Sequence, residues 1–349
     1  MAGPHARAWR AAAIALAAAA SVAATSAALA AAPPRQVWAW ADGNPAIVAQ
    51  LANASWRGVF DGVQASCGMS FVAASADEVA LVVNETVFDT CRPLLAAVHS
   101  SGGAFQVWTG GVPHACLTSA AAAQSAIASA VAVAQQFGLD GFSIDDEYDC
   151  APRSTLANFS LWAGFVSALA DALHAVKGSN LQLSAAVQAM FGIQDVPYAP
   201  LCSPPEKPEC SQACVLAPWA YAPSAAVAAL MSSSSIDRWL EMDTYYFSTA
   251  RFLNALLYYA SVVPPAKLGV ALENRADLSD DDRAARFFAI DRATSTEFLN
   301  IFMLPADDSW LPWLRKWKTR CAGCPNAGVL SCFEPSLACD APAALAPSP

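Results

Sequence analysis

Charged residues are scarce in this chain of 349 amino acids: they make up 14% of it, against 56% hydrophobic residues, and there are only 4 histidines. The sequence has no cluster of basic residues, which a protein needs to neutralise nucleic-acid phosphates or anionic lipids. Acidic residues outnumber basic ones by 29 to 19, which gives a net charge of −10. We therefore expect neither nucleic acid nor anionic lipid as a partner. The high hydrophobic content also excludes a disordered or fibrous protein.

The N-terminus has the features of a secretory signal peptide. Residues 1–32 contain no acid, Arg7 and Arg10 precede an alanine-rich apolar stretch, and Ala28-Leu29-Ala30 fits a cleavage site. We expect residues 1–30 to be removed and the mature protein to be secreted. A membrane anchor and a transit peptide are the alternatives, although so much alanine would make membrane insertion weak. No later segment is long and apolar enough to span a membrane.

The sequence contains 11 cysteines, all of them after the signal. Cysteines in a secreted chain usually form disulfides, and an odd number leaves at least one unpaired or intermolecular. The C-terminal group at positions 321, 324, 332 and 339 also fits a zinc site, but an oxidising compartment favours disulfides. We expect no metal and no cofactor. Three Asn-x-Ser/Thr sequences are acceptors for glycosylation: Asn53, Asn84 and Asn158.

Short apolar runs alternate with helical patterns, such as 119–136 and 154–177, along the rest of the chain. Nine runs have strand character: Gln36–Ala41, Gly58–Ala65, Glu78–Val83, Phe105–Thr109, Gly141–Glu147, Leu181–Gln188, Glu241–Phe247, Lys267–Glu273 and Asn300–Leu304. Strands that alternate with helices pair in parallel through crossover connections. We predict an α/β fold, a (β/α)8 TIM barrel over residues 35–318, with Glu78–Val83 in an extra hairpin. A doubly wound open sheet is the alternative, but no dinucleotide-binding fingerprint supports it.

Two segments depart from this alternation. Pro197–Pro223 is rich in proline and carries three cysteines, which indicates a disulfide-linked insertion. It would follow the fifth strand and lie at the catalytic end of the barrel. Residues 319–349 are expected to form a cysteine-rich tail with a low-complexity end.

The run D-G-F-S-I-D-D-E-Y in the fourth strand is the most informative part of the sequence. Alternation along a strand directs Phe142 and Ile144 outward and Ser143, Asp145 and Glu147 into the bore. Glu147 is nearest the carboxyl end, where barrel enzymes place their chemistry. Neighbouring carboxylates repel each other, so one of them binds a proton more tightly, as a general acid requires. The alternative is a solvated acidic loop after the strand.

This run resembles the signature D-G-x-D-x-D-x-E of glycoside hydrolase family 18, which lies on the fourth strand of that family's barrel. Asp140, Gly141, Asp145 and Glu147 match the signature, and Ser143 replaces its innermost aspartate. On strand three, W-T-G-G resembles the family's S-x-G-G, with both glycines kept. The resemblance implies a divergent chitinase or endo-β-N-acetylglucosaminidase.

Two later stretches are also similar to family motifs. Leu268–Arg275 is similar to L-G-x-P-x-Y-G-R on strand seven and keeps the leucine, the glycine and the arginine. Met242–Tyr245 is similar to M-x-Y-D on strand six, one residue out of register. The tryptophan that the family carries on strand eight has no counterpart in Asn300–Leu304.

The resemblance implies hydrolysis of β-1,4 bonds next to N-acetylglucosamine, with the substrate's own acetamido oxygen as the nucleophile. Glu147 would be the general acid, and Asp145 would orient the acetamido group and stabilise the oxazolinium ion. Tyr245 would complete the catalytic set by hydrogen-bonding the acetamido carbonyl. Further residues are expected to bind the substrate: Ser143, Asp243, Trp40, Trp108, Gly110, Gly111, Glu273 and Arg275.

Two other functions remain open from the sequence. Because Ser143 removes a carboxylate, the protein could be a catalytically weak or inactive sugar-binding, lectin-like protein on the same barrel. Alternatively, Glu147 and Glu273 could be the acid and the nucleophile of a two-glutamate retaining glycosidase. In each case the expected partner is an oligo- or polysaccharide containing N-acetylglucosamine, bound by a monomer.

Overall fold

The computed structural model describes residues 35–41, 45–53, 56, 58–145, 156–187, 229, 231–241, 260, 263–273, 298–302 and 311–319. These residues belong to one compact unit, Arg35–Thr319. The strands are β1 (Gln36–Ala41), β2 (Gly62–Ser66), β3 (Met69–Ala73), β4 (Val79–Val83), β5 (Ala104–Thr109), β6 (Gly141–Ile144), β7 (Gln182–Val187), β8 (Arg238–Glu241), β9 (Leu268–Glu273) and β10 (Phe298–Phe302). The helices are α2 (Pro45–Ala52), α3 (Glu85–Ser100), α4 (Ala115–Thr118), α5 (Ala120–Phe137), α6 (Leu156–His174) and α10 (Leu311–Thr319), with a 3₁₀ turn at Pro265–Lys267.

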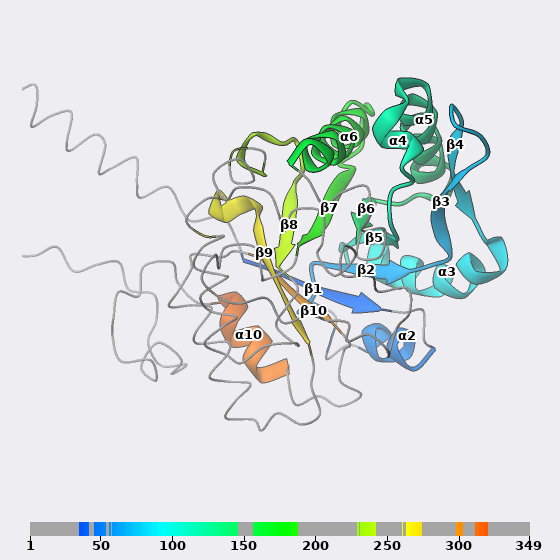
Figure 1. The fold of residues 1–349 in the computed structure, drawn as a ribbon. Coiled ribbons are helices and arrows are strands. Elements are labelled where there is room, and N and C mark those ends of the chain that lie inside the picture. The colour runs from blue at the N-terminus through cyan, green and yellow to red at the C-terminus, as the bar shows by residue number, and fades with distance from the viewer. Residues whose placement is uncertain are drawn as a thin grey trace, which may run out of the picture. The chain divides into compact units, whose positions relative to one another are not determined.

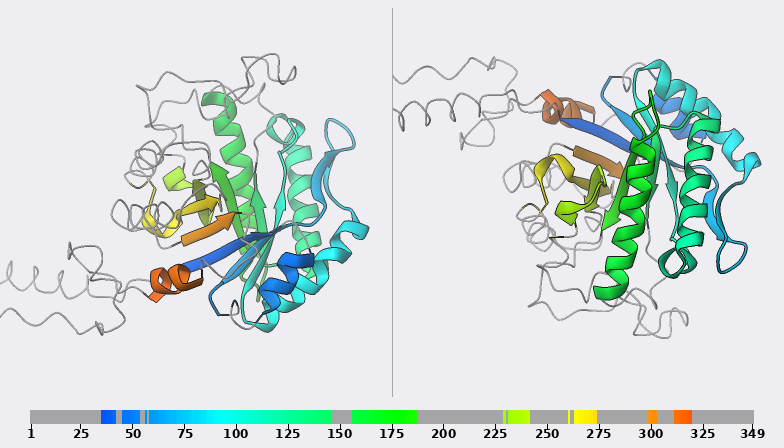
Figure 2. Two further views of the ribbon diagram at one scale, coloured as in Figure 1. Left: turned by 90° about the horizontal axis from the view of Figure 1, so that it is seen from below. Right: turned by 90° about the horizontal axis from the view of Figure 1, so that it is seen from above.

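Eight parallel strands close into a barrel in the order β1-β10-β9-β8-β7-β6-β5-β2 (Figure 1). Helices α3, α5 and α6 lie outside it (Figure 2). The predicted (β/α)8 barrel is confirmed, and the open sheet is excluded. The extra hairpin is confirmed as well, because β4 pairs antiparallel with β3 in a separate two-stranded sheet beside α5.

Three strand predictions need correction. The second barrel strand, predicted from Gly58, begins at Gly62. Sequence patterning misses β3, a short strand in which buried Met69 and Phe71 alternate with exposed neighbours. It also places the sixth barrel strand at Glu241–Phe247, whereas β8 begins at Arg238. A charged residue at the start of a strand argues against burial, yet Arg238 is buried inside the barrel, where other side chains satisfy its hydrogen bonds.

Helices α5 and α6 lie within one to three residues of their predicted bounds. The Ser119 side chain caps α5 by accepting a hydrogen bond from the backbone N–H of Ala122, and Gly138 ends the helix with a φ of +65°. In α6, Trp162 and Val166 belong to an apolar face that is buried against the barrel. These helices therefore hold the outward-facing side of the strands that carry the candidate site.

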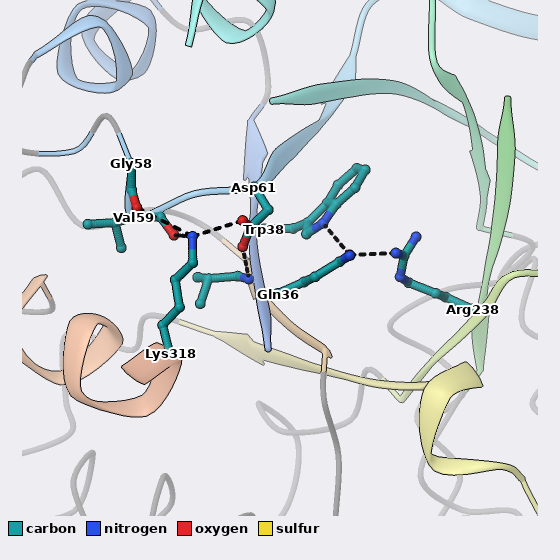
Figure 3. Close-up of polar contacts among 8 residues, drawn as sticks. Gln36, Trp38, Gly58, Val59, Asp61, Arg238 and Lys318 are labelled. Carbon is teal, nitrogen blue, oxygen red and sulfur yellow. Dashed lines mark hydrogen bonds and ion pairs between the residues drawn. The ribbon is translucent and has the colours of Figure 1, made fainter. Parts of the chain in front are cut away.

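The amino-terminal end of the barrel is filled by a buried arginine. Arg238 donates a hydrogen bond to the side-chain oxygen of Gln36 (Figure 3). It donates another to the side-chain oxygen of Gln182 at 2.7 Å. Its guanidinium group also lies over the rings of Phe298 and Trp38, at 4.3 and 5.3 Å from their centroids. Burial lowers the pKa of Arg238 to about 10, against the opposing effect of nearby carboxylates. This end of the bore is thus a packed floor.

Three aspartates immediately before β2, β6 and β8 join neighbouring strands at this floor: Asp61, Asp140 and Asp237. Each carboxylate accepts a hydrogen bond from a backbone N–H of the adjacent strand, at 2.7 to 2.8 Å. Each also contacts a basic side chain; Lys318 of α10 reaches Asp61 at 2.8 Å and the backbone oxygens of Gly58 and Val59 (Figure 3). The repeated contact ties pairs of strands together.

A disulfide joins Cys67, directly after β2, to Cys91 in α3. The Cα atoms are 6.0 Å apart, within the usual range for a bridge. The expectation of disulfides is therefore confirmed for one pair in the described part of the chain. Among the helices that the structure describes, none is long and apolar enough to cross a membrane.

Candidate functional site at the carboxyl end of the barrel

The carboxyl end of β6 positions the first carboxylate of the candidate site. Phe142 and Ile144 are buried in the apolar core outside the strands. Ser143 alternates with them and lies in register with Trp108 of β5 and Ser184 of β7. Asp145 follows β6 and continues the series of Ser143, which faces the bore.

Asp145 is attached to β5 through both its backbone and its side chain. Its backbone N–H donates to the carbonyl oxygen of Thr109 at 3.0 Å. Its Oδ2 atom accepts a hydrogen bond from the indole Nε1 of Trp108 at 3.1 Å. Both Trp108 and Asp145 are half-buried. The carboxylate is therefore held in a defined orientation at the mouth of the barrel.

A layer of polar side chains fills the bore between the floor and the mouth. Its members are buried and come from four strands: Gln64, Gln106, Ser184 and Asn300. The Gln106 side-chain oxygen accepts hydrogen bonds from Gln64 at 2.9 Å and from Ser184 at 3.1 Å, while Asn300 donates to Gln64. Sequence analysis missed this layer, although a single polar residue at an inward position of an otherwise apolar strand is a usable signal.

The other predicted residues in the described part lie at the same end of the barrel. Trp40 is half-buried near the end of β1, in the series of Trp38, which faces the bore. Gly110 and Gly111 directly follow β5, and a side chain added at Gly110 would meet open space. Glu273 is the last residue of β9. Leu268 and Val270 belong to the apolar core outside the strands, so position 273 falls in the other set of alternating backbone positions.

Four predicted residues lie outside the described part of the chain: Glu147, Asp243, Tyr245 and Arg275. Pro197–Pro223 and the tail are outside it as well. The described part of β8 turns Arg238 and Leu240 into the bore, because both contact Trp38 or Phe298 there. In the described part of β8 the even-numbered positions therefore face the bore, whereas the prediction places the odd-numbered Asp243 and Tyr245 there. The roles of these two residues stay predictions.

The first aspartate of the signature serves the floor rather than the mouth. Asp140 precedes β6, accepts a hydrogen bond from the backbone N–H of Phe105 at 2.7 Å, and lies 2.7 Å from His99 Nε2. Because Asp145 is at the other end of the same strand, Asp140 has no access to a ligand at the mouth. In the part of the chain that the structure describes, no group of three or more His, Cys, Asp or Glu side chains could hold a metal ion.

No protein-family model matches the chain, and no curated protein matches it by sequence. Several solved structures share its fold. A GH18 chitinase from Pseudoalteromonas aurantia aligns over 80% of this chain and 97% of its own length, with a TM-score of 0.53 and 14% identity. A GH18 chitinase from Cycas revoluta, solved in complex with allosamidin, aligns over 81% of this chain and 98% of its own length, with a TM-score of 0.52 and 15% identity.

A spore cortex-lytic enzyme from Bacillus megaterium aligns over 81% of this chain and 75% of its own, with a TM-score of 0.53 and 9% identity. At such low identities the likeness concerns the fold. The chain thus shares the barrel fold of these GH18 chitinases, and the resemblance inferred from the sequence is confirmed at the level of the fold.

Proposed function

We propose that this protein is a secreted glycoside hydrolase that cleaves β-1,4 bonds next to N-acetylglucosamine, in chitin or a related glycan. The observation that carries the proposal is the position of Asp145. A carboxylate held by Trp108 at the carboxyl end of the fourth barrel strand lies where barrel enzymes carry their chemistry. The match of fold with chitinases supports the proposal as an analogy.

In the proposed reaction the substrate's own acetamido oxygen attacks the anomeric carbon. Glu147 gives its proton to the glycosidic oxygen as the bond to the leaving sugar breaks, and an oxazolinium ion forms. Asp145 orients the acetamido group and stabilises the positive charge of this ion. Water then attacks the anomeric carbon and returns a proton to Glu147, which leaves the product with the original anomeric configuration.

The remaining residues of the site would bind the sugar chain. Trp40 and Trp108 are half-buried at the mouth, so part of each ring can contact a sugar. Gly110 leaves space for a ligand to approach the backbone after β5, and Gly111 next to it is exposed. We keep Asp243, Tyr245 and Arg275 as proposed contacts on the sequence resemblance alone.

Ser143 supports a second candidate, a sugar-binding protein with little or no activity. This side chain is 2% exposed and lies directly before Asp145 in the inward series, where the family signature has an aspartate. A serine hydroxyl cannot share a proton with Asp145 as a carboxyl group can. Binding would then survive while turnover is weak.

One set of assays separates these functions. The wild-type protein, Glu147→Gln and Glu273→Gln should be tested on labelled chitooligosaccharides and on a high-mannose glycopeptide. We expect turnover in the wild type, its loss in Glu147→Gln, and its retention in Glu273→Gln. Loss in both variants would instead indicate the two-glutamate mechanism, and binding without turnover by the wild type would indicate the lectin-like function.

A second substrate tests the nucleophile. If the acetamido oxygen attacks the anomeric carbon, the same oligosaccharide without its N-acetyl groups cannot react, although its glycosidic bonds are unchanged. We therefore expect no cleavage of the deacetylated chain. Cleavage at a similar rate would contradict substrate assistance.

We also propose that the protein passes through the secretory pathway. The signal-like N-terminus supports this, and so does the Cys67–Cys91 disulfide, because such bonds are rare in reducing compartments. Expression in a eukaryotic secretory host, followed by mass spectrometry of the N-terminus and of the three acceptor asparagines, tests cleavage and glycosylation together. An intact residue 1–30 segment on the exported protein would contradict signal cleavage.

A further inference from the structure

Trp108 has a polar contact that sugar stacking does not require. Its indole N–H points across the barrel wall from β5 to the Asp145 carboxylate, with 3.1 Å between Nε1 and Oδ2. The two residues are 37 positions apart in the chain. The contact therefore depends on the pairing of β5 with β6, which places Trp108 opposite Ser143.

The pairing of the two strands continues up to the carboxylate. The backbone N–H of Asp145 is bonded to Thr109, the residue after Trp108, so the two chains keep their register up to the carboxylate. The flanking residues Val107 and Phe142 are fully or almost fully buried in the core outside the strands and hold both backbones in place. The backbones that carry Trp108 and Asp145 are thus held side by side.

The chemistry of the contact is also restricted. An indole N–H is a donor that cannot accept a hydrogen bond or take up a proton. Its hydrogen bond is stronger to a carboxylate than to a neutral carboxyl group, so the contact favours the ionised form of Asp145. The side chain before Asp145 on the inward face is the neutral Ser143, and the groups of the polar layer below are amides and a hydroxyl. Trp108 donates a hydrogen bond to this carboxylate directly.

We propose that Trp108 is a positioning residue for Asp145: its N–H keeps the carboxylate ionised and oriented, so that Asp145 can stabilise the cationic intermediate. This inference rests on the proposed function. It assigns to an indole on β5 a direct contact with the carboxylate that follows Ser143 on the inward face. Trp108 acts through Asp145, and any contact of its ring with the sugar is separate.

The proposal predicts which kinetic constant changes. Trp108→Phe keeps an aromatic ring but removes the donor. Loss of one hydrogen bond to a charged group that acts on the transition state should lower kcat about 10- to 100-fold. KM should change little, because ground-state binding is largely kept. A stacking role would instead raise KM.

A double-mutant cycle tests whether the effect passes through Asp145. The activities of Trp108→Phe, Asp145→Asn and the double variant should be measured on the chitooligosaccharide that the wild type cleaves. If Trp108 acts through Asp145, Trp108→Phe should have little further effect in the Asp145→Asn background. Trp56→Phe is a matched control, since Trp56 is buried against Phe60 ahead of β2, at the floor end of the barrel.

A second variant guards against a folding defect. Benzothienylalanine introduced at position 108 has a sulfur atom in place of the N–H and keeps the shape of the ring. We expect it to lower kcat as Trp108→Phe does. Its midpoint of thermal unfolding should differ from that of the wild type only by the effect of the one lost hydrogen bond. Wild-type kcat in this variant, additive losses in the cycle, or a raised KM at constant kcat would overturn the assignment of Trp108. Absence of wild-type turnover would overturn the proposed function, and the positioning role with it.

Discussion

The structure predicts that replacement of Gly141 by alanine will destabilise the barrel. Gly141 begins β6, the strand that leads to Asp145, and has a φ of +138°, which side-chain-bearing residues rarely adopt. A Cβ atom added there would lie 1.8 Å from the backbone oxygen of Gln182 in β7. Because that atom is backbone, no side-chain rotation can relieve the clash. Gly141→Ala should therefore push β6 and β7 apart.

The magnitude follows from the contacts around Gly141. Real Cβ contacts are essentially never shorter than 3.0 Å, so the strands must separate locally by about 1.2 Å, from 1.8 Å to 3.0 Å. This movement strains the hydrogen bond from the Gln182 N–H to the Asp140 oxygen, now 2.8 Å long. Loss of a buried backbone bond costs about 1–3 kcal/mol, and the backbone strain about 1–3 kcal/mol more. We expect a loss of about 2–6 kcal/mol, a large part of the stability of an ordinary domain.

Urea unfolding monitored by circular dichroism measures this loss. Gly164→Ala is the control: Gly164 is exposed in α6, no atom lies within 4 Å of an added Cβ, and alanine should stabilise the helix by about 1 kcal/mol. The two substitutions are chemically identical and should have opposite signs. If Gly141→Ala were as stable as the wild type, the packing of β6 against β7 described above would be wrong. Activity should fall with Gly141→Ala, because displacement of β6 also displaces Asp145.

Two further predictions concern the connection from β2 to α3. Replacing both Cys67 and Cys91 by serine should lower the free energy of unfolding by about 3–4 kcal/mol, since the bridge closes a loop of 24 residues; equal unfolding midpoints for the variant and the oxidised wild type would contradict this. Asn84 caps α3 by accepting a hydrogen bond from the backbone N–H of Val87. Asn84→Ala should cost about 1 kcal/mol in thermal unfolding, whereas Asn84→Asp, which keeps an acceptor oxygen, should be near wild type; equal losses in both would exclude the cap as the cause.

Local patterns in the sequence determined the parts of the fold that depend on neighbouring residues. Alternation predicts β1 at its observed bounds, and caps and apolar spacing predict α5 and α6 to within two or three residues. The direction of Phe142 and Ile144 also follows from alternation, because the period of a strand is set by its own backbone. Where one polar residue interrupts this logic, as Arg238 does at the start of β8, the prediction fails.

Only the tertiary structure decided which distant residues meet. Trp108 and Asp145 are each identified by sequence, but their hydrogen bond requires the register of β5 against β6. Gln64, Gln106, Ser184 and Asn300 form one layer only because the barrel closes β10 and β2 around β1. Asp140 and Asp145 look equivalent in the signature, yet they lie at opposite ends of β6 and serve the floor and the mouth. The physical reason is that strand pairing joins groups far apart along the chain, and no local pattern encodes that register.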